Sequence, residues 1–218
     1  MKSAESHFQF VTASYLTRIG DQKATTLAEL GEGLKDSSDA SVFYHTFQTL
    51  GRHHFLTEGF SNDFAQWVLA SCNRAELAEQ LASLDIRDYL SLAELRTDLH
   101  RIVTEYCATY PAYAGQVAFE PFYFCDAIEV AVPLGVEART LEEFRRGLER
   151  LSHAAFHYHF VASRLRLHLR TNDFSLWLET SLGLSALAQR VNRIDIYTNT
   201  LESARVKLAA LVDEEAAR

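Results

Sequence analysis

The stretch SNDFAQWV at residues 61–68 returns at residues 171–178 as TNDFSLWL. Upstream of these segments the repetition continues in a register of 114 residues, so that Tyr44–His45 aligns with Tyr158–His159. The sequence therefore predicts an internal duplication. We expect a first repeat at 1–110, a linker at 111–118 and a second repeat at 119–218, packed together as one globular unit.

Each repeat opens with a segment rich in aromatic and β-branched residues, at about 7–18 and 121–133. This composition predicts a strand or hairpin. Gly20 and Gly135 follow and are expected to mark turns. Periodic apolar residues in the remainder of each repeat predict four to five helices. The expected fold is mainly α (α+β), with two tandem pseudo-symmetric repeats related by a pseudo-two-fold axis.

Helix starts are marked by capping residues at matching places in both repeats. Thr26 with Glu29, and Thr140 with Glu143, have the spacing of a capping box. Helix N-caps are also expected at Ser61 or Asn62, Ser91, Thr171 or Asn172, and Thr200. The aromatic residues on these helices are expected to form the core, namely Phe43, Phe47, Phe64, Trp67, Phe156, Phe160, Phe174 and Trp177.

Composition narrows the class of protein. The formal net charge is −8, which argues against nucleic-acid binding, since that function normally shows as a basic domain. Apolar runs fall well short of the roughly 18 residues of a membrane span, and the N-terminus lacks the apolar core of a signal peptide. Three widely spaced cysteines indicate neither a disulfide framework nor a zinc knuckle. We therefore expect a cytoplasmic protein without contact to nucleic acid or membrane.

The segments FYHTFQTLGRHHFL (43–56), TNDFSLWLETSLG (171–183) and YTNTLESARVKL (197–208) resemble the domain-of-unknown-function family 5752. The resemblance covers nearly the whole chain. It implies a bacterial cytoplasmic protein that is encoded among carbohydrate-related enzymes, one of which could be its partner. It implies no catalytic residues.

A polar stripe on the second expected helix is the main candidate site. His45, Thr49 and Arg52 have the spacing i, i+4, i+7, which places them on one helix face. The second repeat keeps the pattern as His159, Ser163 and Arg166. Such a face could bind an anion or a sugar, or it could instead be a structural stripe whose arginines pair with nearby acids and whose histidines are satisfied packing residues.

Asp63 and Asp173 extend this candidate site, together with Tyr44 and Tyr158. Each aspartate follows an Asn that could cap a helix, so it could serve the cap alone, pair with Arg52 or Arg166, or orient the histidines.

A metal site has weaker support. His153 and His157 have a spacing of i, i+4, but the first repeat has Asp39 and Phe43 at the aligned positions. No metal and no cofactor are predicted.

No sequence motif of a known catalytic class is present. The leading hypothesis is therefore a non-catalytic binding or accessory protein that docks on a partner protein or senses a small anionic or sugar-like ligand. The alternatives are a small enzyme with a His/Arg site between the repeats, a metal protein, or a purely structural interaction protein. Catalytic residues remain unknown at this stage.

Overall fold

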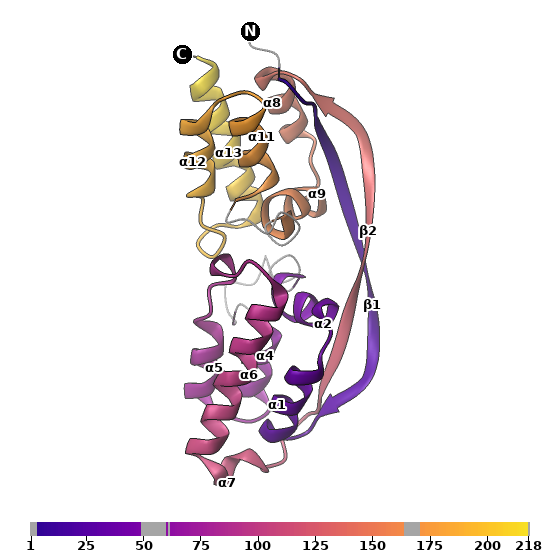
Figure 1. Cartoon of the computed structure of the whole chain (residues 1–218), viewed down its shortest axis with the longest axis vertical. Helices are drawn as coiled ribbons and strands as arrows, with labels where there is room; N and C mark the ends of the chain where they lie inside the picture. Colours follow the sequence, from indigo (N-terminus) through magenta and orange to yellow (C-terminus); the bar gives the residue numbers. More distant parts are fainter. Residues whose placement is uncertain (1–3, 49–59, 61, 164–170, 218) are drawn as a thin grey trace. The chain divides into compact units, whose positions relative to one another are not determined.

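The computed structural model describes residues 4–48, 60, 62–163 and 171–217 (Figure 1). As predicted, the chain is mainly helical, and one strand followed by helices occurs twice. The two strands, β1 (Phe8–Ala24) and β2 (Phe122–Ala138), pair with each other in a two-stranded antiparallel sheet. Among the described residues, no helix is long and apolar enough to cross a membrane.

The helices after the two strands follow a similar order, except that η2 and α7 occur in the first half alone among the described residues. After β1 come α1 (Leu27–Asp36), α2 (Asp39–Phe43), the π-helix η1 (Tyr44–Gln48), α4 (Asp63–Ala70), α5 (Ala75–Ala82), the 3₁₀-helix η2 (Ile86–Asp88), α6 (Leu92–Thr109) and α7 (Pro111–Ala114). After β2 come α8 (Leu141–Glu149), α9 (His153–His157), the π-helix η3 (Tyr158–Ala162), α11 (Asp173–Thr180), α12 (Ser185–Asn192) and α13 (Leu201–Ala216).

Both strands are longer than predicted, and the expected turns at Gly20 and Gly135 are wrong because both glycines lie inside strands. At Gly20 the reason is close approach, since a Cβ there would lie 2.7 Å from the carbonyl oxygen of Phe124. Gly135 has a φ of +68°, a conformation that favours glycine. The two glycines therefore allow a close backbone contact at Gly20 and a positive φ at Gly135 within continuous strands.

The capping residues that the sequence indicated begin the helices. Thr140 and Glu143 form a complete capping box at α8. At α1 the Thr26 hydroxyl accepts the N–H of Glu29 at 3.1 Å, whereas the Glu29 carboxylate accepts the N–H of Thr25 at 2.6 Å. The carboxylate half of the first box therefore uses Thr25 instead of Thr26. Later helices use Asn62, Ser91, Asn172 and Thr200 as N-caps.

The chain packs into two compact units, and both strands are divided between them. One unit is Tyr15–Ile128, and the other combines Met1–Ser14 with Glu129–Arg218. Each unit thus contains the opening segment of the other repeat's strand. The predicted boundaries at 110 and 119 divide the chain by sequence similarity, and they stay a prediction about the repeats.

Aromatic side chains fill the core of each unit. In the first unit Phe122 and Phe124 from β2 lie beside Phe64 of α4. In the second, Phe8 and Phe10 from β1 lie beside Phe144 of α8. The predicted core residues are buried except Phe43, which is only half-buried and stacks on Phe47 at 5.8 Å.

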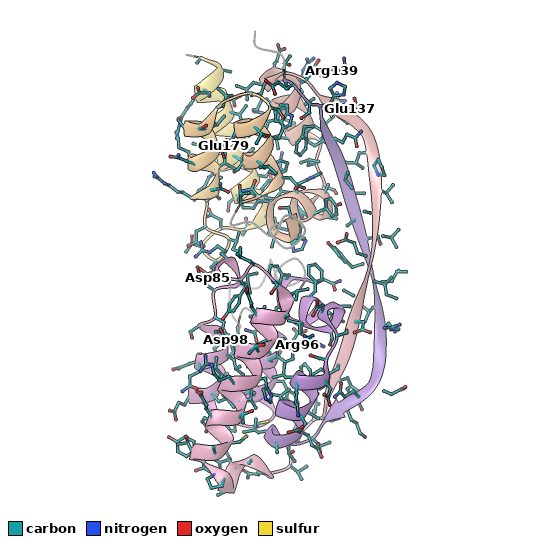
Figure 2. The ribbon with its side chains drawn as sticks, in the orientation of Figure 1. Asp85, Arg96, Asp98, Glu137, Arg139 and Glu179 are labelled. Carbon is teal, nitrogen blue, oxygen red and sulfur yellow. The ribbon has the colours of Figure 1, made fainter. Side chains whose placement is uncertain are left out.

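Polar side chains tie neighbouring helices together at the surface. Arg96 of α6, labelled in Figure 2, donates to the carbonyl oxygen of Ser37 at 2.8 Å and to the carboxylate of Asp39 at 2.9 Å. These contacts connect α6 with the end of α1 and the start of α2.

Candidate functional site

The predicted site residue His159 connects two segments that are distant in sequence. Its Nδ1 lies 2.7 Å from Oδ2 of Asp173, at the start of α11, and its Nε2 lies 2.8 Å from the backbone nitrogen of Val11 in β1. A backbone N–H can only donate, so Nε2 accepts and the ring proton is on Nδ1, which donates to Asp173. The ring is therefore a neutral imidazole that binds the backbone of β1.

His45 forms the same arrangement in the other unit. Its Nδ1 lies 2.9 Å from Oδ2 of Asp63, and its Nε2 accepts the N–H of Cys125, in β2, at 3.0 Å. We call each of these arrangements a strand clamp: His45 with Asp63 and Cys125, and His159 with Asp173 and Val11. Each aspartate therefore holds the ring of its histidine, one of the roles left open for it, and pairing with Arg52 or Arg166 falls outside the described residues.

Both imidazoles are deeply buried, with 3% of each histidine exposed. His45 lies against Phe122 and Phe64, at centroid distances of 4.7 and 5.2 Å. His159 lies against Phe8 and Phe174, at 5.0 and 5.4 Å. Because burial of an unpaired polar group is costly, the two hydrogen bonds of each ring are needed for its stability in this core.

The tyrosines and Ser163 lie next to the clamps. Tyr44 and Tyr158 contact the edges of the neighbouring histidines at 4.8 and 5.1 Å. The buried hydroxyl of Ser163 donates to the carbonyl oxygen of His159 at 2.6 Å. The other predicted members of the stripe, Thr49, Arg52 and Arg166, lie outside the described residues.

Two glycines explain how the strands come so close to the helices. A Cβ on Gly147 of α8 would lie 2.3 Å from the nearest ring carbon of Phe10, and a Cβ on Gly33 of α1 would lie 2.4 Å from the ring of Phe124. These four residues repeat in the sequence at the same spacing as the histidines. Their repetition is the sequence signal for this close packing of strand on helix.

A groove lies beside the His159 clamp, with a volume of about 320 Å³. We call it the clamp groove. Its apolar wall is formed by Phe8, Val11, Leu176 and Trp177. Polar residues from three segments line the remainder, namely Ser6, His7, Gln9, Tyr158, His159, Asp173, Thr180 and Ser181. Gln9 and His7 also contact Glu137 of β2, labelled in Figure 2, at 3.4 and 3.2 Å.

The two histidines considered for metal binding, His153 and His157, lie in different environments. His153 is exposed and lies 3.6 Å from the carboxylate of Glu202, whereas His157 is 4% exposed. In the part of the chain that the structure describes, no group of three or more His, Cys, Asp or Glu side chains is arranged to hold a metal ion.

Comparison with known proteins places these features in a family. A solved structure, OrfY from Thermoproteus tenax, superposes with a TM-score of 0.85 at 27% sequence identity, over 100% of this chain and 99% of that one. A search of curated proteins finds no match. The model of the family of unknown function DUF5752 matches residues 5–213. On this match, the chain belongs to the DUF5752 family.

Proposed function

We propose that this protein is a non-catalytic binding protein that holds a small sugar-like ligand in the clamp groove. The observation that carries the proposal is the hydrogen bonding of the His159 ring beside the groove. Both of its ring nitrogens are engaged, one with Asp173 and one with the backbone of Val11, while polar side chains line the groove beside it.

The His–Asp pair supports binding over catalysis. A general base must direct an available lone pair at the proton that it removes. In His159 this lone pair accepts the N–H of Val11, and in His45 it accepts the N–H of Cys125. The pairs therefore support the walls of the groove and the core, as a rigid binding site requires.

The side chains in the groove match the hydroxyl groups of a sugar. The carboxylate of Asp173 can accept hydroxyl protons, and the amide of Gln9 can donate or accept. The hydroxyl of Thr180 donates to the carbonyl oxygen of Leu176 at 2.8 Å and keeps lone pairs for a ligand. A volume of about 320 Å³ suits a ligand of monosaccharide size. The carboxylate of Asp173 in the groove wall accepts hydrogen bonds and repels anions, which favours a neutral ligand over an anionic one.

Calorimetric titration with neutral monosaccharides, and with the corresponding sugar phosphates, tests the proposal. We expect a neutral sugar to bind, and we expect NMR to recover it unchanged after incubation. Turnover of the sugar would establish the enzyme alternative, and failure of every neutral sugar to bind would refute the proposal.

A pair of threonine variants gives a matched control for this titration. Thr180→Val should weaken sugar binding about two- to tenfold, the range of one neutral hydrogen bond. Thr97→Val removes the same type of bond, from a threonine hydroxyl to the carbonyl oxygen of Ala93 at 2.8 Å, at a residue that does not line the groove. Equal binding by both variants would exclude the groove as the site. Docking on a partner protein such as a carbohydrate-related enzyme stays a prediction.

A further inference from the structure

The unit Tyr15–Ile128 contains a second pocket, with a volume of about 340 Å³. It is lined by residues of the turn between α4 and α5, of α7 and of the segment that follows α7. We call it the Arg74 pocket. The side chains important for its chemistry are Cys72, Arg74, Tyr113, Gln116, Val117 and Phe119.

Arg74 supplies the positive charge of this pocket. Its guanidinium carbon lies 3.9 Å from the ring centroid of Tyr113, a stacked cation–π arrangement. One terminal nitrogen donates to the carbonyl oxygen of Asn73 at 2.9 Å, and the other donates to the side-chain oxygen of Gln116. Among the described residues, no carboxylate forms an ion pair with Arg74, although most other arginines of the described surface have one.

This geometry leaves part of the guanidinium available to a ligand. The group has five N–H donors in a planar fork, and the contacts above use two of them. A half-buried cation without a carboxylate partner is a favourable site for an oxyanion, because charge-assisted hydrogen bonds to the fork are short and strong.

Comparison of the two repeats shows that the turn itself does not require an arginine. The second repeat builds the same turn with Gly183 and Leu184, in which the N–H of Leu184 donates to Leu178 at 2.8 Å, as that of Arg74 donates to Val68 at 3.2 Å. Asn73 has a φ of +56° and Gly183 a φ of +68°, so both repeats place a left-handed residue before it. The turn therefore forms without a positive charge at position 74.

The rim of the pocket is apolar. Phe119 is 86% exposed and Val117 is 75% exposed, although the N–H of Phe119 is anchored at 2.8 Å to the carbonyl oxygen of Ser71. Burial raises the pKa of the Cys72 thiol to about 12, so this wall carries no negative charge at neutral pH. The pocket thus combines one cation with an apolar surface that a ligand could cover.

We propose that the Arg74 pocket binds a small organic oxyanion, with its carboxylate or phosphate on the fork of Arg74 and an apolar body against Phe119. This site is separate from the clamp groove and takes a different ligand class. It is independent of whether the groove binds a sugar.

Calorimetric titrations with small probes test the two halves of the proposed ligand. Phenyl phosphate and benzoate carry both an anionic group and an aromatic ring. Inorganic phosphate and acetate carry the anionic group without the ring, and benzyl alcohol carries the ring without the anionic group. We expect one of the two aromatic anions to bind at least tenfold more tightly than the matching simple anion, inorganic phosphate or acetate, and at least tenfold more tightly than benzyl alcohol. The preferred head distinguishes a phosphate ligand from a carboxylate ligand. Failure of both aromatic anions to bind overturns the proposal.

Variants locate the binding. Arg74→Met keeps an apolar stem over Tyr113 and should weaken binding of the aromatic anion by at least tenfold. Arg101→Met is the control, since it removes an exposed cation from α6, outside the pocket. Phe119→Ala should weaken phenyl phosphate and leave inorganic phosphate unchanged, and its high exposure preserves the fold.

The thiol of Cys72 gives a second readout that is independent of calorimetry. In a Cys107→Ser, Cys125→Ser background, a bound aromatic anion should slow alkylation of Cys72 at least threefold at alkaline pH, where enough of the thiol is ionised to react. Binding that persists in Arg74→Met, or that leaves Cys72 equally reactive, would place the anion elsewhere and refute the assignment.

Discussion

Replacing Gly33 with alanine should destabilise the unit Tyr15–Ile128 through a single contact. The new Cβ would lie 2.4 Å from two ring carbons of Phe124, where carbon atoms normally approach to about 3.5–4.0 Å. Phe124 is 4% exposed and lies 5.0 Å from the ring of Phe122, so its ring has little room to move. Overpacking of this kind costs about 1–3 kcal/mol, and the helix propensity of alanine offsets up to about 1 kcal/mol. With the full offset, we expect a net loss of about 0–2 kcal/mol.

Gly31→Ala is the matched control in the same helix, α1. A Cβ at Gly31 would lie 3.6 Å from Cγ1 of Val103, an ordinary contact. Without a clash, only the helix propensity remains, and this variant should be between unchanged and about 1 kcal/mol more stable. The two substitutions should therefore have opposite signs, or at least differ by more than 1 kcal/mol.

Urea unfolding measures this difference. Trp67 lies 5.8 Å from Phe122 and reports on the same unit, and a Trp177→Phe background removes the second fluorophore. Adding Phe124→Leu to Gly33→Ala should recover part of the loss, since the smaller side chain gives the new methyl group space. Equal stabilities for Gly31→Ala and Gly33→Ala would refute the close approach of β2 to α1.

Three further outcomes follow from the described contacts. His159→Phe leaves the N–H of Val11 without its acceptor and should cost about 1–3 kcal/mol, with faster hydrogen exchange at Val11; unchanged exchange there would contradict the clamp. Trp67→Ala should lower the free energy of unfolding by about 3–5 kcal/mol, because it removes a buried ring whose Nε1 donates to the carbonyl oxygen of Glu120. A melting temperature close to that of the parent would exclude a core role for Trp67. Hydrogen bonds lower the pKa of Glu143 below 4.5, and the largest contribution comes from the backbone N–H of Arg139. The stability difference between the parent and Glu143→Gln should therefore be present above pH 4.5 and disappear as the pH falls further. A difference that persists in acid would refute this linkage.

Much of the local structure could be predicted from the sequence, because helix starts and apolar faces depend on residues close together in the chain. Asn62, Asn172, Ser91 and Thr200 indicated N-caps, and the helices begin after them. The repetition of Tyr44–His45 as Tyr158–His159 singled out both histidines. The strand ends were wrong at Gly20 and Gly135, since a glycine can mark either a turn or a close approach inside a strand.

Only the tertiary structure decided what the repeated residues contact. Phe10 packs beside Gly147 and Phe124 beside Gly33, so each opening strand segment lies on the helices of the other repeat. When two repeats carry the same Phe and Gly residues, their sequence is equally compatible with a strand on its own helices or on those of its partner. The acceptors for the histidines are likewise backbone groups far away in the chain. Sequence patterns specify which residues need a partner, and the three-dimensional path of the chain decides which partner they find.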